Sequence, residues 1–172
     1  ELINVRVPKS HVIMGLGKGF EIAQGRLGPG RIHHCMRAIG AAERALSLAI
    51  ERGLSRTAFG QPIIQLGGNL ERIAHARMAI DQARLLTLNA AWKVDNQGIK
   101  HAMTEISAIK VVVPNMLTQV VDMAIQLHGG AGMNHDSPLA GFATMARSLR
   151  LADGPDEVHT AMVSRLEMAK YK

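Results

Sequence analysis

Three short segments of this 172-residue chain gather polar and glycine residues of the kinds that hold phosphates or move protons. They are Arg56-Thr57-Ala58-Phe59-Gly60, Gln126-Leu127-His128-Gly129-Gly130 and Asp153-Gly154-Pro155-Asp156-Glu157. Each segment also has a structural interpretation, because Arg56 fits a solvated loop, Gly129 and Gly130 a helix stop, and Asp153 a helix N-cap. Their joint occurrence favours a binding site, since free backbone amides at helix ends and in glycine turns can hold a phosphate or pyrophosphate.

Other kinds of site are disfavoured. The histidines form no HExxH or other paired-ligand spacing, and the adjacent His33 and His34 point to different helix faces, so no metal site is expected. Cys35 falls on an apolar-leaning stripe and no GxSxG motif occurs, which argues against nucleophilic catalysis. The basic residues are scattered and no aromatic platform accompanies them, so we expect no nucleic-acid partner and keep a helical DNA reader only as a weak alternative.

The composition indicates a globular helical domain. Hydrophobic residues make up 47% and charged residues 20%, whereas aromatic residues reach only 3%, which favours a core of aliphatic side chains on helices. The net charge of +6 suits an anionic partner such as a nucleotide, a CoA ester, nucleic acid or a membrane surface. A single cysteine excludes an intrachain disulfide and indicates a reducing compartment. No run of 18 or more apolar residues occurs, so no transmembrane segment is expected.

Helical periodicity dominates from Arg31 onward. It predicts long helices over about 31–53 and 66–94, a third through the seam at 103–127, a shorter helix over 138–149 and a last helix opened by Asp153. The third is the clearest, with Met103, Ile106, Ile109, Val113, Met116, Val120, Met123 and Leu127 on one face. Pro114 should kink this helix without ending it, because the periodicity resumes after it.

The first residues follow a different pattern. Residues 2–8 alternate apolar and polar side chains and end at Pro8, as a half-buried strand does. A lone strand is not stable, so it should pair with strands from outside this sequence. The chain begins at Glu1 without a leader, which we interpret as a piece of something larger. The predicted fold is therefore all-α, an up-and-down four-helix bundle with a short extra helix and a short N-terminal β segment.

At the three polar segments the sequence resembles the C-terminal part of the acyl-CoA dehydrogenase family. RTAFG at 56–60 matches that family's R-x-x-F-G, QLHGGAGM at 126–133 matches its Q-x-x-G-G-x-G, and LADGPDE at 151–157 stands where the family has Y-E-G-T-S-Q. NVRVPKSHVIMGLGKGF is similar to the end of the family's central β-domain, so the resemblance covers essentially the whole chain. GPGRIHHCMRAIG and RLADGPDEVH look particularly like the branch of family members ten and eleven.

The resemblance implies a domain division and a reaction. Residues 1–25 would end a central β-domain and residues 26–172 would form the C-terminal helical bundle domain. The complete enzyme would use FAD to oxidise an acyl-CoA thioester to the trans-2-enoyl-CoA: a carboxylate removes the α-proton and the β-hydrogen leaves as hydride to the flavin. An electron-transfer flavoprotein or similar acceptor would reoxidise it, in a homo-oligomeric dimer or tetramer. The setting would be mitochondrial or peroxisomal in a eukaryote and cytoplasmic in a bacterium.

Carried over by position, Asp153 takes the place of the family's catalytic glutamate. It is one methylene shorter, so a shifted backbone or a less polar environment would be needed for efficient proton removal. Some relatives carry their glutamate near the start of the first long bundle helix, where this chain has Gly30. The resemblance places Gly28, Pro29, Gly30, Arg31 and Gly154 on the substrate side. Arg31 has the structural alternative of a surface residue at a helix start.

The resemblance also implies FAD contacts. The adenosine-pyrophosphate half would be held across a subunit interface by Arg56, Gln126, Leu127, His128, Gly129 and Gly130. Pro155, Asp156 and Glu157 replace the family's T-S-Q, and Arg165 matches a later cofactor-side arginine. These two acids cannot donate the hydrogen bonds of a hydroxyl and an amide while ionised. Gly67 stands where many relatives have a cofactor-contacting glutamine. These departures keep open a second interpretation, a non-catalytic helical interaction module derived from the family.

Overall fold

The computed structural model describes residues 1–172 and confirms a helical bundle. Its helices are α1 (Gly19–Ser55), α2 (Asn69–Gln97), α3 (Met103–His128), α4 (Leu139–Leu149) and α5 (Asp156–Ala169). Short 3₁₀ turns are η1 (Lys9–His11), η2 (Ile63–Gln65) and η3 (Gly129–Met133). Two short strands, β1 (Thr57–Ala58) and β2 (Gln61–Pro62), pair antiparallel in a hairpin between α1 and α2.

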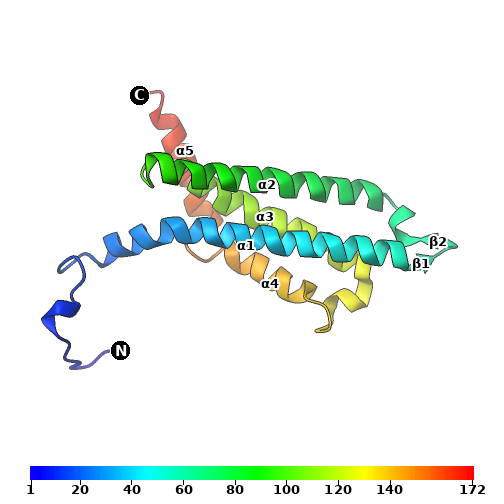
Figure 1. Cartoon of the computed structure of the whole chain (residues 1–172), viewed down its shortest axis with the longest axis horizontal. Helices are drawn as coiled ribbons and strands as arrows, with labels where there is room; N and C mark the ends of the chain where they lie inside the picture. The colour runs from blue at the N-terminus through cyan, green and yellow to red at the C-terminus, as the bar shows by residue number, and fades with distance from the viewer.

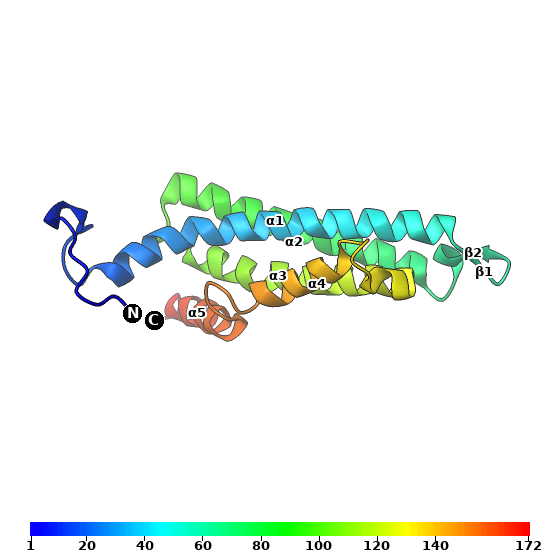
Figure 2. The ribbon, with the colours of Figure 1, turned by 90° about the horizontal axis from the view of Figure 1, so that it is seen from below.

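The helices alternate in direction along the bundle (Figure 1). α1 and α3 run toward the end that carries the β1–β2 hairpin, while α2 and α4 run back, which gives the up-and-down topology (Figure 2). α3 is the central element, because it contacts α1, α2, α4 and α5. α5 packs against α3 at the opposite end from the hairpin.

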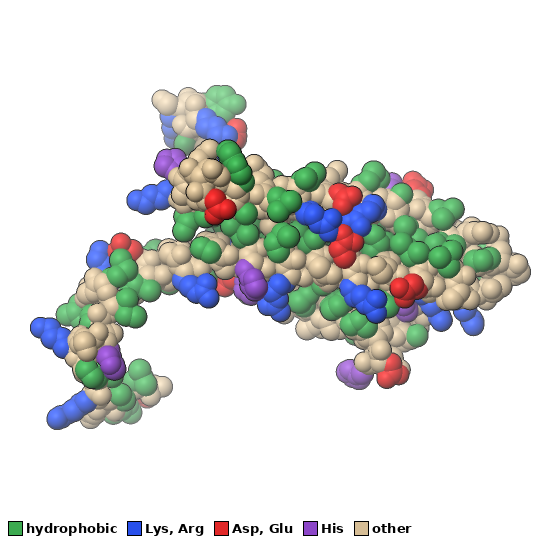
Figure 3. Space-filling view, in the orientation of Figure 1, with side chains coloured by type: hydrophobic (Ala, Val, Ile, Leu, Met, Phe, Trp, Pro, Cys, Tyr) green, Lys and Arg blue, Asp and Glu red, His purple; other side chains and the backbone are tan.

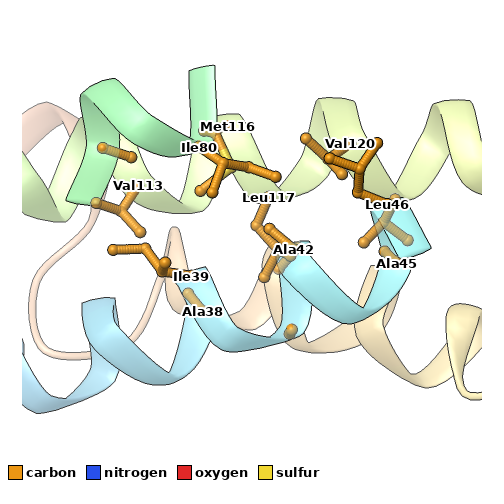
Figure 4. Packing of buried hydrophobic residues seen from close by; sticks show 14 of the residues in the cluster. Ala38, Ile39, Ala42, Ala45, Leu46, Ile80, Val113, Met116, Leu117 and Val120 are labelled. Atoms are coloured by element: carbon orange, nitrogen blue, oxygen red, sulfur yellow. The ribbon is translucent and has the colours of Figure 1, made fainter. Parts of the chain in front are cut away.

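The core lies between α1, α2 and α3, where most of the predicted seam of α3 is buried and only Met103 and Met123 are partly exposed (Figure 4). Small residues on α1, including Ala38, Ala42 and Ala45, are fully buried and allow Val113 and Leu117 of α3 to approach closely. Two large apolar residues on the 3.6-residue repeats of these helices are exposed, Met36 on α1 and Leu70 on α2. Both lie at the edge of an apolar stripe, where the 3.6-residue repeat alone does not distinguish core from surface.

The beginning of the chain differs from the expectation. Residues 2–8 form no strand, and residues 1–18 are exposed, with only the short turn η1 among them. The physical reason is the absence of a pairing partner, without which an alternating segment cannot form a ladder. α1 begins at Gly19, earlier than Arg31, and continues through Gly28, Pro29 and Gly30.

One segment, Met103–Met133, is long and apolar enough to cross a membrane by length and composition, unlike the expectation from apolar runs. Half of its most apolar window is buried inside the bundle. The contacts of α3 with four other helices account for that composition as the requirement of a central core helix. The helix continues through Pro114 without ending, as predicted.

Candidate active site

Asp153 lies in the loop between α4 and α5, in an unusual backbone conformation. Its φ is 56°, in the left-handed region that non-glycine residues seldom adopt, and Gly154 follows with φ 103°. Pro155 is the N-cap residue of α5, and no side chain caps this helix. The N-cap interpretation of Asp153 is therefore wrong, because the helix begins after the turn that this residue opens.

Two side chains hold the backbone carbonyl of Asp153. Arg31 on α1 donates from Nε at 3.1 Å and from Nη2 at 2.9 Å to this oxygen. His159 on α5 places its Nε2 at 3.2 Å from the same oxygen, and because a carbonyl only accepts, this nitrogen donates. Arg31 is 8% exposed and His159 3% exposed. The carbonyl is thus fixed from two helices that are far apart in the sequence.

Burial changes the ionisation of both donors. Desolvation lowers the pKa of Arg31, and the nearby Asp153 charge opposes this effect. Desolvation also lowers the pKa of His159, against the opposing effect of its hydrogen bond to Asp153. The positive charges of Arg31 and Lys110 lower the pKa of His159 further. A neutral imidazole that donates through Nε2 is therefore the form favoured next to Asp153.

The Asp153 side chain lines an open hollow of about 630 Å³ on the α1 side of the loop. Pro29 and Gly30 line the same hollow, together with Arg26, Leu27, His33 and His34. His34 Nε2 lies 3.6 Å from Asp153 Oδ2. Of the other predicted substrate-side residues, Gly28, Arg31 and Gly154 do not line this hollow. A Cβ on Gly28 would lie 3.2 Å from Ile99 Cγ2, so this glycine packs against the loop before α3.

Lys110 on α3 approaches the same loop from inside the bundle. Its Nζ donates to the carbonyl of Leu149 and, at 2.9 Å, to the carbonyl of Ala152. Lys110 is 2% exposed, and desolvation lowers its pKa. The segment that carries Asp153 is therefore held by side chains of α1, α3 and α5.

The acids that follow Asp153 have different surroundings. Asp156 Oδ2 accepts from Arg150 Nε at 2.7 Å and from Asn115 Nδ2 at 3.3 Å, which ties this carboxylate to the bundle. Glu157 is exposed at the start of α5. Arg165, on the same helix, is exposed and donates to the Met162 sulfur. Pro155, Asp156, Glu157 and Arg165 thus share the end of the molecule with Asp153.

A second group of predicted residues lies at the hairpin end. Gln126 and Leu127 line a hollow with Ile63, Leu66, Gly67, Asn69 and Arg72. Arg56 is adjacent, because its carbonyl accepts from the Ile63 amide at 2.9 Å. His128 donates from Nδ1 to the Ala124 carbonyl at 2.8 Å, and Gly129 and Gly130 form the start of η3. Arg31 belongs to the first group and Arg56 to the second. The stretch of α1 that separates them is about 37 Å long.

Sequence reasoning missed three residues of the Asp153 site, namely His34, Lys110 and His159. A signal for Lys110 was present, because it occupies the buried face of α3 between Ile106 and Val113, where a charge requires a partner. No pattern pointed to His159, which follows Asp153 by only six residues. No group of three or more His, Cys, Asp or Glu side chains lies where it could hold a metal ion.

The comparison with known proteins decides the family. Residues 17–167 match the model of the acyl-CoA dehydrogenase C-terminal domain. The chain belongs to the acyl-CoA dehydrogenase family. It is 56% identical over 165 residues to mouse acyl-CoA dehydrogenase family member 10, covering 96% of this chain and 15% of that protein. The proposed likeness to the branch of members ten and eleven is thereby confirmed, since rat member 11 is 50% identical over 96% of this chain and 21% of its own.

Solved acyl-CoA dehydrogenases have the same fold. Butyryl-CoA dehydrogenase from Megasphaera elsdenii superposes with a TM-score of 0.85 at 30% identity, over 94% of this chain and 42% of that one. The chain therefore spans less than half the length of these acyl-CoA dehydrogenase relatives.

Proposed function

We propose that this chain is the C-terminal helical domain of an FAD-dependent acyl-CoA dehydrogenase in which Asp153 is the α-proton base. The enzyme oxidises an acyl-CoA thioester to the trans-2-enoyl-CoA. Residues 1–25 would join a preceding β-domain, with α1 of the bundle already beginning at Gly19, and residues 26–172 would form the rest of the bundle. The observation that carries the proposal is the placement of the Asp153 carboxylate on an open hollow beside Pro29 and Gly30.

The Asp153 carboxylate suits the role of a base. Arg31 and His159 donate to the backbone carbonyl of Asp153. Neither side chain donates to its carboxylate. The one titratable side chain within ion-pair distance is His34, whose Nε2 lies 3.6 Å from Asp153 Oδ2. A carboxylate whose oxygens are not held by other donors can approach the acidic carbon of a substrate, which a general base requires.

The hairpin end has a donor set that fits a diphosphate. Arg72, Asn69 and Gln126 line the hollow at this end, the Asn69 amide also donates to the Ile63 carbonyl at 2.7 Å, and no acidic residue lines it. Gly67 leaves space there, since a Cβ on this residue would meet no atom within 4 Å. Guanidinium and amide donors match phosphate oxygens. Arg56, Gln126, Leu127, His128, Gly129 and Gly130 would hold the adenosine-pyrophosphate half of FAD.

The residues of this chain define the proton step. The α-proton passes from the substrate carbon to an Asp153 oxygen, and the electron pair left behind forms the new carbon–carbon double bond as hydride leaves the β-carbon. FAD, when bound, supplies the acceptor for that hydride. Arg31 keeps Asp153 oriented and adds a positive charge near the developing negative charge of the substrate. Pro29 and Gly30, which line the hollow, would provide the wall against which the acyl group lies.

The separation of the two groups supports a shared site in a homo-oligomer. About 37 Å of α1 lies between Arg31 and Arg56, and one dinucleotide is too short to touch both ends. Each protomer would therefore supply Asp153 to one active site and Arg56 and Gln126 to the cofactor of a neighbour. Pro155, Asp156, Glu157 and Arg165 lie at the Asp153 end and would approach the flavin half there. An electron-transfer flavoprotein is the acceptor that fits this chemistry.

The test uses the full-length flavoprotein and its Asp153→Asn variant. FAD content is measured by absorbance and chromatography, and anaerobic bleaching by a series of acyl-CoA thioesters is followed by stopped flow. We expect equal FAD content and a loss of bleaching rate of about 10²- to 10⁴-fold in the variant. Asp95→Asn is the matched control, because Asp95 is exposed on α2.

Two results would count against the proposal. Bleaching of Asp153→Asn at the wild-type rate would overturn the base assignment while leaving the family's reaction in place. A wild-type protein that no acyl-CoA reduces would instead favour the second candidate, a non-catalytic interaction module. The side chain of Asp156, which accepts hydrogen bonds from Arg150 and Asn115, is the feature that favours this second candidate.

A further inference from the structure

Lys110 is the most deeply buried charged side chain of the protein. It is 2% exposed, and its neighbours on the same face of α3, Ile106, Ile109 and Val113, are fully buried and apolar. An ammonium group in such a place loses its hydration, and this loss is unfavourable unless hydrogen bonds replace the water. The buried position therefore has to be explained by what Nζ contacts.

The partners of Lys110 are the last carbonyls around the end of α4. Nζ donates to Leu149, the last residue of that helix, and to Ala152 at 2.9 Å. Carbonyls at a helix C-terminus lack intrahelical donors and carry the negative end of the helix dipole. The ammonium of Lys110 provides a donor to the Leu149 and Ala152 carbonyls, and its positive charge interacts favourably with the negative end of the helix dipole. The interaction thus fixes the point where α4 ends and the Asp153 loop begins.

The loop is held from three helices at successive residues. Lys110 of α3 binds the Ala152 carbonyl, while Arg31 of α1 and His159 of α5 bind the next one, that of Asp153. Asp153 itself has φ 56°, a conformation that costs free energy for a residue with a Cβ. Such a conformation persists only where surrounding contacts impose it. Lys110 supplies the contact that precedes the strained residue.

We propose that Lys110 is a positioning residue for Asp153, which acts by locking the carbonyls of Leu149 and Ala152 so that the Asp153 carboxylate faces the substrate hollow. The proposal rests on the proposed function of Asp153, but the locking of the loop is a separate property that can be measured without turnover. Lys110 itself touches neither the hollow nor the reacting atoms.

Two variants separate the hydrogen bonds from the packing. Lys110→Met keeps an unbranched chain of similar length and removes every donor, which leaves the Leu149 and Ala152 carbonyls without their partner. Lys110→Gln keeps an amide donor without the charge. Lys93→Met is the matched control, because Lys93 is partly buried and pairs with Glu105 on α3, not with a carbonyl of the Asp153 loop.

The first measurement is hydrogen exchange in the full-length protein. The amides of Leu151 and Ala152 bond to the Ser148 carbonyl, and the amide of Asp156 bonds to the Arg150 carbonyl. We expect Lys110→Met to speed exchange across residues 150–156 by at least about tenfold, with little change in α1 and α2. Lys110→Gln should lie between Met and wild type, and Lys93→Met should match wild type in this segment.

The second measurement is single-turnover flavin bleaching by acyl-CoA. A shift of the base by a fraction of an ångström lowers the rate of proton removal without weakening binding. We expect Lys110→Met to bleach about 10- to 100-fold more slowly, with FAD content and affinity for the enoyl-CoA product within about twofold of wild type. Lys110→Gln should recover part of the rate.

Several results would overturn the proposal. A lower melting temperature with an unchanged bleaching rate per bound flavin would make Lys110 merely structural. Exchange that rises evenly over all helices, or not at all, would exclude a local lock. If Lys110→Met does not fold, Lys110→Gln takes its place. Wild-type exchange over residues 150–156 together with a wild-type bleaching rate in Lys110→Gln would then overturn the proposal. If acyl-CoA does not bleach the wild-type flavin, only the base function of Asp153 is contradicted. The hydrogen-exchange result still tests whether Lys110 restrains the Asp153 loop.

Discussion

Arg31 binds the backbone of Asp153 and not its carboxylate. Both guanidinium contacts, from Nε at 3.1 Å and Nη2 at 2.9 Å, end on the carbonyl oxygen of Asp153. The carboxylate therefore has a buried positive charge close by without a direct ion pair to it. This arrangement separates two tasks, because the loop is fixed by one oxygen of Asp153 while another remains free to accept a proton.

The fork geometry of Arg31 leads to the first prediction. Arg31→Lys keeps the charge but cannot place two donors on one carbonyl in the same plane. We expect the free energy of unfolding to fall by about 1–3 kcal/mol and acyl-CoA bleaching of the flavin to slow by about 10- to 100-fold. Denaturant unfolding and stopped-flow absorbance measure the two effects. Arg44→Lys, at an exposed position of α1, should change neither quantity. If Arg31→Lys and Arg44→Lys behave alike, the paired donors of Arg31 do not fix the Asp153 loop.

Gly154 is required by both its backbone angle and its surroundings. Its φ is 103°, and a Cβ at this position would lie 2.9 Å from His159 Nε2. Gly154→Ala should lower the free energy of unfolding by about 1–3 kcal/mol, because strain and the displacement of His159 add. The control is Gly40→Ala on α1, where a Cβ meets nothing within 4 Å. There alanine should be neutral or stabilising by up to about 1 kcal/mol. Chemical denaturation of the two variants should give opposite signs.

His159 makes the stability of the Asp153 loop depend on pH. Its pKa in the folded state lies below the ordinary value of 6.5, because burial disfavours the imidazolium. Below pH 6.5 the unfolded chain therefore binds the proton first, and the free energy of unfolding falls as the pH falls toward the folded-state pKa. Above pH 6.5 this contribution is constant.

A variant series isolates this effect. His159→Gln retains a donor toward the Asp153 carbonyl and cannot titrate, so its free energy of unfolding should lose the dependence on pH below 6.5. His75→Gln on α2 removes a histidine whose side chain is 69% exposed, and should keep the wild-type dependence. Urea unfolding at pH 5, 6, 7 and 8 compares the three proteins, with the pH values chosen around the ordinary imidazole range. A His159→Gln slope equal to that of wild type would exclude His159 as its origin.

The bundle could be predicted from the sequence because its signal is local and repeated. Ile106, Ile109 and Val113 recur at helical spacing, and burial of one helix face follows directly from that repeat. The Asp153 site could be predicted only in part. Arg31 and Asp153 are 122 residues apart, and their contact depends on how three helices pack. Residues 2–8 failed as a strand because strand formation depends on a partner, which a pattern within one segment does not contain.

The two longest helices are joined by an ion-pair network on the outer surface. Lys/Arg and Asp/Glu side chains gather over the seam between α1 and α2 (Figure 3). Glu43 of α1 accepts from Arg77 Nη1 at 2.8 Å and Nη2 at 2.7 Å, and also from Arg84 of α2. Hydrogen bonds from Arg77 are the main cause that lowers the pKa of Glu43 from 4.5 to about 2. The bidentate geometry is the kind of surface pairing that contributes measurable stability.

Glu43→Gln should therefore destabilise the protein only where Glu43 is ionised. A lowered folded-state pKa gives a contribution that is fully present above pH 4.5 and is lost as the pH falls toward 2. At pH 7 we expect a loss of about 0.5–1 kcal/mol that shrinks at high salt, since these side chains are partly exposed and screened. Urea unfolding at low and high ionic strength measures it. Glu51→Gln, an exposed position of the same helix, should be neutral throughout. A Glu43→Gln deficit unchanged by both salt and acid would show that packing, and not charge, joins α1 to α2 at this point.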